Sequence, residues 1–177
     1  MKKSHKIFLI IFVVFILSGC VTLPIKIPEP AAEKIISIPG FKKNQIYEQC
    51  KIFIAENFKS AKAVIEYDNK EQGILIGNGN VKYPCTGSFE CSALHDWVIT
   101  FGMRIDVKDE KIRVSFSRLT VFFPSSSAIY FPLYIPARSS GERSLTEEEY
   151  VNVKSKLLEI ADRLATSVKA SGKKESW

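Results

Sequence analysis

The sequence is poor in the residues from which catalytic sites are most often built. It contains only two histidines in 177 residues, His5 and His95, and neither a Gly-x-Ser-x-Gly motif nor a phosphate-binding glycine loop. His95 stands beside Asp96 at the start of a strand-like run, a position more typical of a surface residue than of a general base. We therefore expect a non-enzymatic protein without a cofactor and rank an enzyme last among the function classes.

Long apolar runs are lacking except near the N-terminus. There Ile7 to Leu17 is unbroken, and Lys2, Lys3 and Lys6 precede it. This is the order of the positive and apolar regions of an export signal. Eleven helical residues span roughly 16 Å, about half of a bilayer core, so we do not expect a retained transmembrane helix.

The apolar run ends at Leu17-Ser18-Gly19-Cys20. An aliphatic residue, two small residues and a cysteine in this register resemble the lipobox of bacterial lipoproteins. The resemblance implies a diacylglyceryl group on Cys20, cleavage before it, and fatty acids such as palmitate as the membrane anchor. The alternative is an ordinary secretory signal with Cys20 there by chance. Because Val21 is not the aspartate that retains many lipoproteins at the inner membrane, family analogy favours the outer membrane, facing the periplasm, over another leaflet.

Cleavage would divide the chain into a signal peptide of residues 1–19, a lipidated proline-containing tether of residues 20–32, one domain of residues 33–170, and a frayed tail of residues 171–177. The tether could instead pack on the domain. Loss of residues 1–19, which hold three lysines and no acid, lowers the formal charge from +6 to +3. No long basic run remains, so we expect no nucleic-acid partner.

Three cysteines follow Cys20. Cys50 falls on the apolar stripe of an expected helix, which predicts a buried, inert thiol. Cys85 and Cys91 are candidates for a disulfide, because an exported protein meets an oxidising compartment. A zinc site with His95 is the weaker alternative, since the spacing matches no usual ligand pattern and a fourth ligand is not evident. We therefore expect no metal.

The apolar periodicity predicts a strand, a helix, four antiparallel strands and a final helix. From 97 to 107 apolar residues take every second position, and from 112 to 123 the same alternation slips by one residue near Ser117-Arg118, which predicts a β-bulge. Asn44 is the expected cap of a helix over 45–58, and Ser144 to Glu147 has capping-box spacing before the last helix. Each helix has one apolar stripe, so both should cover one face of the sheet in a two-layer α+β domain.

Residues 124–143 form an expected irregular insert between the last strand and the last helix. Serines stand at both ends, and the apolar centre contains Tyr130, Phe131 and Tyr134 with prolines between and after them. These three side chains are candidate docking residues for a partner or membrane. The alternative is that the segment folds back and completes the core.

Three stretches of the domain resemble a family of uncharacterised bacterial domains that is common in lipoproteins. They are Gly40-Phe41, Ala55 to Lys62, and Gly73 to Gly79. The resemblance covers roughly 35–122 and implies a TATA-binding-protein-like (helix-grip-like) fold with the element order given above. It implies no activity, since that family has no defined catalytic residues.

The sequence thus favours a lipid-anchored envelope protein that binds or scaffolds another, unidentified envelope protein. The alternative is a carrier of a small apolar ligand in a cavity between sheet and helices, for which Gly77 and Gly79 would leave room. A filled core would favour the binding module, and a ligand-sized cavity would favour the carrier.

Overall fold

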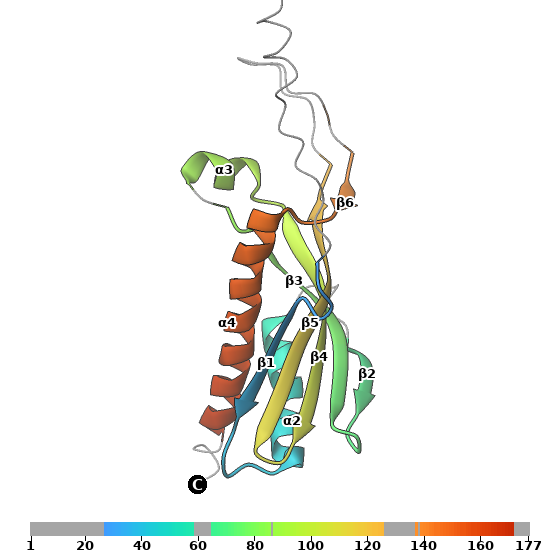
Figure 1. The fold of residues 1–177 in the computed structure, drawn as a ribbon, viewed down its shortest axis with the longest axis vertical. Coiled ribbons are helices and arrows are strands. Elements are labelled where there is room, and N and C mark those ends of the chain that lie inside the picture. Colours follow the sequence, from blue (N-terminus) through green and yellow to red (C-terminus); the bar gives the residue numbers. More distant parts are fainter. Residues whose placement is uncertain (1–26, 59–64, 86, 126–136, 138, 172–177) are drawn as a thin grey trace, which may run out of the picture.

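The computed structural model describes residues 27–58, 65–85, 87–125, 137 and 139–171. A six-stranded antiparallel sheet forms one layer and two long helices form the other (Figure 1). The strands are β1 (Ala32–Ser37), β2 (Ile65–Asn69), β3 (Ile74–Lys82), β4 (Val98–Lys108), β5 (Lys111–Phe123) and β6 (Gly141–Arg143). The helices are α2 (Lys43–Asn57), the short α3 (Ser88–Ala93) and α4 (Glu147–Ser171).

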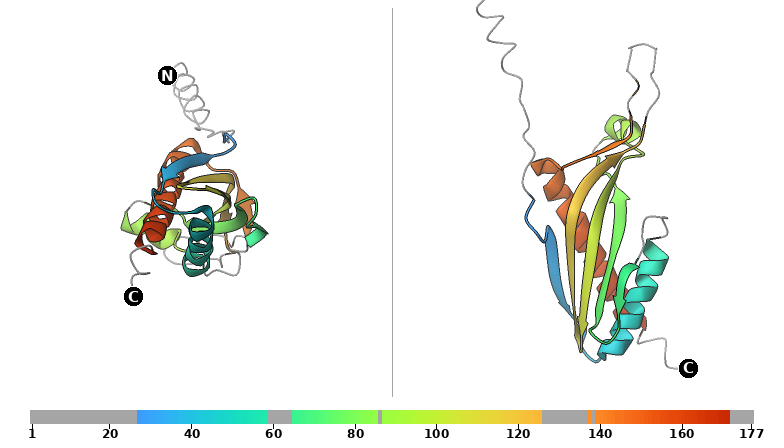
Figure 2. Two further views of the ribbon diagram at one scale, coloured as in Figure 1. Left: turned by 90° about the horizontal axis from the view of Figure 1, so that it is seen from below. Right: turned by 90° about the vertical axis from the view of Figure 1, so that its right-hand side faces the viewer.

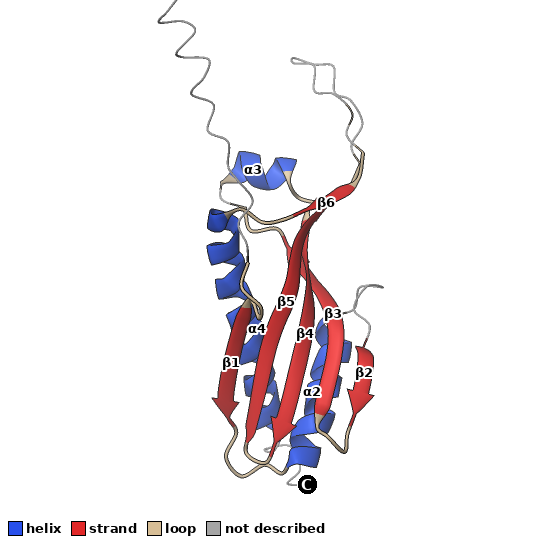
Figure 3. Ribbon diagram, turned by 45° about the vertical axis from the view of Figure 1, so that its right-hand side comes forward, coloured by secondary structure: helices blue, strands red, loops and turns tan. Residues whose placement is uncertain are grey.

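The strands are arranged in the order β1-β5-β4-β3-β2, and β6 pairs with the end of β5. Figure 3 shows α2 and α4 on the same side of this sheet, which leaves the other face without a helix, and the side view of Figure 2 agrees. The predicted two-layer α+β architecture with both helices on one face is therefore confirmed. We call the helix-free side the open face.

The core lies between the sheet and the two helices. Phe101 of β4 and Phe116 of β5 meet edge to face with their ring centroids 5.5 Å apart, and Phe58 contacts Phe101 at 6.1 Å. The apolar stripe of α4 is buried as its spacing predicts, from Val153 to Val168. Burial of this stripe, more than the intrinsic propensity of its residues, holds the helix in place.

The predicted β-bulge is present. Thr100 of β4 pairs with Thr120, but Gly102 pairs with Ser117, so β5 has one extra residue at this point. Arg118 takes the left-handed conformation there, with φ +54°. The slip keeps Leu119 and Val121 on the core side with Phe116.

Gly79 lies where a side chain would have no room. A Cβ atom on Gly79 would come within 2.7 Å of the Phe101 ring and 3.3 Å of Phe58. Aromatic rings therefore fill the space that the carrier alternative needed at this glycine.

Both helices begin elsewhere than the sequence predicted. Helix α2 starts at Lys43, not after Asn44, because two side chains satisfy its first amides: Gln45 Oε1 accepts from the Lys42 N–H at 3.0 Å and Asp109 Oδ1 from the Lys43 N–H at 2.7 Å. The capping box before α4 is Thr146 with Glu149, not Ser144 with Glu147.

Two boundaries also differ. Residues 141–143 are not irregular, as expected for the insert, but form β6, which makes six strands where five were expected. Ala31 and Ala32 are buried, with the Ala31 N–H donating to the Phe116 carbonyl at 2.7 Å and its carbonyl accepting from the Tyr150 hydroxyl at 2.7 Å. The domain therefore begins before residue 33, and the predicted tether ends earlier than residue 32. Of the expected tail, residues 171–177, Ser171 is the last residue of α4 and residues 172–177 lie outside the described residues.

Candidate functional site

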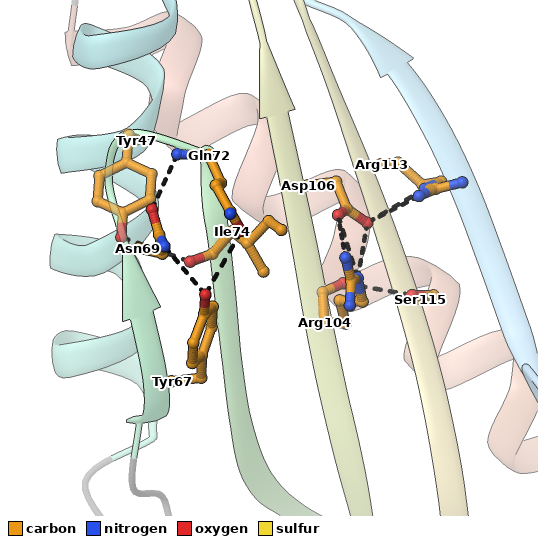
Figure 4. Close-up of polar contacts among 9 residues, drawn as sticks. All are labelled: Tyr47, Tyr67, Asn69, Gln72, Ile74, Arg104, Asp106, Arg113 and Ser115. Carbon is orange, nitrogen blue, oxygen red and sulfur yellow. Dashed lines mark hydrogen bonds and ion pairs between the residues drawn. The ribbon is translucent and has the colours of Figure 1, made fainter.

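Near the β4–β5 hairpin, polar side chains of neighbouring strands form a ladder on the open face, in which Asp106 of β4 accepts hydrogen bonds from two arginines (Figure 4). Arg104 binds both carboxylate oxygens, with its Nε 3.1 Å from each and its Nη2 2.8 Å from Oδ1. Arg113, directly opposite Asp106 on β5, binds Oδ2 through Nη2 at 3.0 Å and Nε at 3.2 Å. Burial alone would raise the pKa of Asp106, but these hydrogen bonds outweigh it and lower the pKa.

Half-exposed residues of β2 and β3 flank the ladder. In the pairing register Ile74 lies opposite Asp106 and Ile76 opposite Arg104, and Tyr67 of β2 lies opposite Ile76. The Tyr67 hydroxyl accepts a hydrogen bond from Asn69 at 2.9 Å. This surface presents charges and hydrogen-bonding groups beside apolar side chains, a combination that suits binding.

The bulge residue Arg118 organises the next part of the open face. Its backbone N–H donates to Glu29 Oε1 at 3.0 Å, and its guanidinium donates to Asn78 Oδ1 at 2.9 Å while lying over Gly102. The hydroxyls of Thr100 and Thr120 share a hydrogen bond of 2.6 Å beside it. A shallow polar depression results, and Arg118 ties the N-terminal segment to the sheet.

A second cluster lies where β3, β4, β6 and the start of α4 meet. Its centre is Glu149, which is 8% exposed. The carboxylate accepts from Arg143 of β6 at 2.6 and 2.8 Å, from the Thr146 N–H at 2.7 Å, and from the Tyr83 hydroxyl. Burial would raise the pKa of Glu149, but the hydrogen bonds from Arg143, Tyr83 and Thr146 hold it at about 2. Burial and the Glu149 contact raise the pKa of Tyr83 to about 12.

Aromatic rings surround this ion pair. The Arg143 guanidinium lies 5.6 Å from the Trp97 ring centroid, and Trp97 contacts Tyr83 at 5.5 Å and Phe123 at 5.3 Å. Since Phe123 pairs with Gly141, the two ends of the insert leave the sheet side by side. We call these residues, Tyr83, Trp97, Phe123, Arg143 and Glu149, the insert clamp.

Most of the predicted site residues lie outside the described part of the chain. These are the lipid-attachment candidate Cys20 and the docking candidates Tyr130, Phe131 and Tyr134. In the described part the structure joins Cys85 to Cys91 with an S–S distance of 2.06 Å, and Cys50 is buried, with burial raising the pKa of its thiol to about 12.

His95 is exposed and lies 2.9 Å from Asp96, with its other ring nitrogen 3.0 Å from the Ser92 carbonyl. Within the described ranges no three His, Cys, Asp or Glu side chains gather where they could hold a metal ion.

Sequence reasoning missed the insert clamp. One signal was available, because Thr146 and Glu149 have capping-box spacing, but the overlapping pair Ser144 and Glu147 has it too. Nothing in the spacing connects Glu149 to Tyr83, which is 66 residues away.

The thiols give a direct chemical test. Denatured, unreduced protein lacking residues 1–19, with Cys20 blocked by its lipid, should show one reactive thiol, that of Cys50, and two more after reduction. A count of three before reduction, or a peptide map that joins Cys50 to Cys85 or Cys91, would contradict the disulfide.

The comparisons with known proteins agree with this fold. Residues 33–122, half of the chain, match the model of a family described as a domain of unknown function (DUF4468) with TBP-like fold. The chain belongs to the DUF4468 family. The family name carries no activity, so the insert clamp and open face of this DUF4468 protein have to be interpreted from their own chemistry.

Two solved structures show the same fold. A DUF4468 family protein from Bacteroides ovatus aligns with a TM-score of 0.52 at 15% identity, over 78% of this chain and 82% of its own. A TBP-like protein from Parabacteroides distasonis aligns with a TM-score of 0.50 at 11% identity, over 76% and 90%. No curated protein matches. At these identities the likeness establishes the fold and nothing finer.

Proposed function

We propose that this DUF4468 protein is a lipid-anchored protein of the cell envelope whose domain binds or scaffolds another envelope component without catalysing a reaction. The proposed anchor is the lipidated Cys20, in the outer membrane and facing the periplasm. The proposed docking residues are Tyr130, Phe131 and Tyr134. None of the helices in the described residues is long and apolar enough to cross a membrane.

The insert clamp is the observation that carries this proposal. A partly buried ion pair, three aromatic rings and the β5–β6 pairing fix both ends of an apolar segment at one end of the sheet. A binding loop with a fixed base loses less conformational entropy when it docks than a loop with a free base does. The clamp therefore supports a docking role for the segment that it holds.

The N-terminal segment joins the domain near the same end. Glu29 binds the Arg118 amide three residues before the β6 pairing begins, and Ala31 binds Tyr150 in the first turn of α4. An anchor at Cys20 would therefore approach the domain from the side that carries the insert. This arrangement favours a partner that is itself at or near the membrane.

The carrier alternative has no comparable observation in its favour. It was based on the space for a ligand that glycines in the strand would leave, but at Gly79 the rings of Phe101 and Phe58 fill that space. Two pockets lined by described residues open on the other side of the sheet, at Arg113 and at Arg118.

Changing Tyr130, Phe131 and Tyr134 together to serine tests the docking role. We expect the melting temperature to stay within about 2 °C of the wild type, because surface changes usually cost under ~0.5 kcal/mol, while the envelope partner no longer co-purifies. Ile52→Ser, at an exposed apolar side chain on α2, is the control that should keep the partner. A large fall in melting temperature for the triple variant would assign the segment to the core and refute the proposal.

A further inference from the structure

The β4–β5 hairpin is closed by two lysines that face each other. Lys108 and Lys111 are directly paired across the strands and both are exposed on the open face. Like charges directly opposite in a sheet destabilise it. Neither lysine makes an ion pair with any described residue, and Arg113 adds a third cation two residues further along β5 on the same face.

The acidic side chains nearby do not neutralise this pair. Asp106 already accepts hydrogen bonds from Arg104 and Arg113. In the hairpin turn, Asp109 accepts from the Lys43 N–H at 2.7 Å and Glu110 from the Gly40 N–H at 3.0 Å, so both carboxylates are held against the connection between β1 and α2. The hairpin end of the open face therefore presents three cations, Lys108, Lys111 and Arg113, against Asp106, with Glu33 further along β1 opposite Ser115.

This charge surrounds a shallow depression of about 230 Å³ lined by Ile35, Asp106, Lys108, Lys111, Ile112 and Arg113. Ile35, on the edge strand β1, is 66% exposed and lies opposite Arg113. The depression therefore combines one exposed apolar side chain, Ile35, with three cations, since Ile112 is buried. It suits a ligand that is both acidic and partly apolar.

We propose that the hairpin end of the open face binds an extended acidic peptide segment of a partner protein. Residues two apart on an extended chain lie on one side, about 6.8 Å apart. Lys111 and Arg113 have this spacing along β5, so acidic residues at alternate positions of a peptide can meet both. An apolar residue of the same peptide covers Ile35. The site is distinct from the insert and does not depend on docking through it.

The test is binding of a fluorescent peptide to the full chain, followed by anisotropy at low ionic strength. The peptide carries one leucine and two glutamates at successive alternate positions with serines between them, so that all three side chains lie on one side of the extended chain. Lys108→Gln combined with Lys111→Gln should weaken binding about tenfold or more, the effect of removing two attractive charges. Lys82→Gln combined with Lys154→Gln removes the same charge elsewhere and should change binding less than about twofold. Without peptide, the Lys108/Lys111 variant should melt at or above the wild-type temperature, since a repulsion is removed.

The other outcomes overturn the proposal. Equal losses in the two double variants would mean general charge attraction with no site. Absence of peptide binding at low salt would mean that no acidic peptide is held. Binding to vesicles of equal parts phosphatidylcholine and phosphatidylglycerol that requires Lys108 and Lys111, with no peptide binding, would assign the surface to a membrane. A lower melting temperature of the Lys108/Lys111 variant would show that the lysine pair is structural.

Discussion

Replacing Glu149 by glutamine should destabilise the domain by up to about 3.5 kcal/mol at neutral pH. The carboxylate has its pKa lowered from 4.5 to about 2 in the folded state, and each pKa unit corresponds to about 1.4 kcal/mol. The variant leaves Arg143 and Tyr83 facing an amide that cannot carry the charge. Chemical denaturation of both proteins measures the difference.

The pH dependence of this difference has a fixed sign. Because the folded-state pKa of Glu149 is below the unfolded value, its stabilisation is complete above about pH 4.5 and disappears as the pH falls towards 2. The gap between wild type and Glu149→Gln should therefore be constant at neutral pH and close in acid. Glu148→Gln, at an exposed neighbour on the same turn, should stay within about 0.5 kcal/mol of the wild type. A difference in unfolding free energy below about 0.5 kcal/mol, or one that does not change with pH, would contradict a stabilising role of the insert clamp.

Truncating Phe101 to alanine should cost about 3–5 kcal/mol, because the ring is 2% exposed and packs against Phe58, Phe116 and the backbone of Gly79. For a chain of this size that corresponds to a fall of roughly 10 °C or more in melting temperature. Thermal denaturation followed by circular dichroism measures it. A loss under about 1 kcal/mol would mean that this side of the sheet is loosely packed and would revive the carrier.

Gly79→Ala tests the same packing from the opposite side. Its Cβ would meet the rigid, buried Phe101 ring at 2.7 Å, so we expect a cost of about 1–3 kcal/mol. Gly102→Ala is the matched control, because the atoms it meets at 2.7 Å belong to the flexible tip of Arg118. In a Phe101→Leu background the cost of Gly79→Ala should shrink, and equal costs in both backgrounds would contradict the contact.

Much of the fold could be predicted because burial imposes a period on the sequence. The alternation from Trp97 to Val107 predicted β4, and the slip near Arg118 predicted the bulge. Without the extra residue at this point, the apolar side chains that follow in β5 would face water. The apolar stripe of α4 could be predicted for the same reason, because its buried residues recur at helical spacing. These features depend on each residue and its near neighbours along the chain.

The features that could not be predicted depend on contacts between distant residues. The strand β6 is Gly-Glu-Arg, with no β-forming tendency of its own, and forms where it pairs with β5 and Arg143 binds Glu149. The same carboxylate selects Thr146 over Ser144 as the helix cap. Arg104 and Asp106 share a face by spacing alone, but the contact with Arg113 requires the register between β4 and β5.

The burial of Ala31 and Ala32 has a similar cause. Both are small and follow a proline, which favours an extended tether, but the backbone of Ala31 is held by Phe116 and Tyr150. Those partners lie 85 and 119 residues further along the chain. The end of the tether is thus set by the folded domain and not by the tether's own composition.

The proposed function depends first on whether the chain is anchored at Cys20, and labelling with a fatty acid in living cells tests this directly. At about 0.8 kcal/mol per buried methylene, two or three acyl chains make detachment from the membrane negligible. Wild-type protein should take up the label and sediment with membranes, while Cys20→Ala should take up none and lose its membrane association. Equal labelling of the two proteins would contradict the anchor, and with it the proposed place of this protein in the envelope.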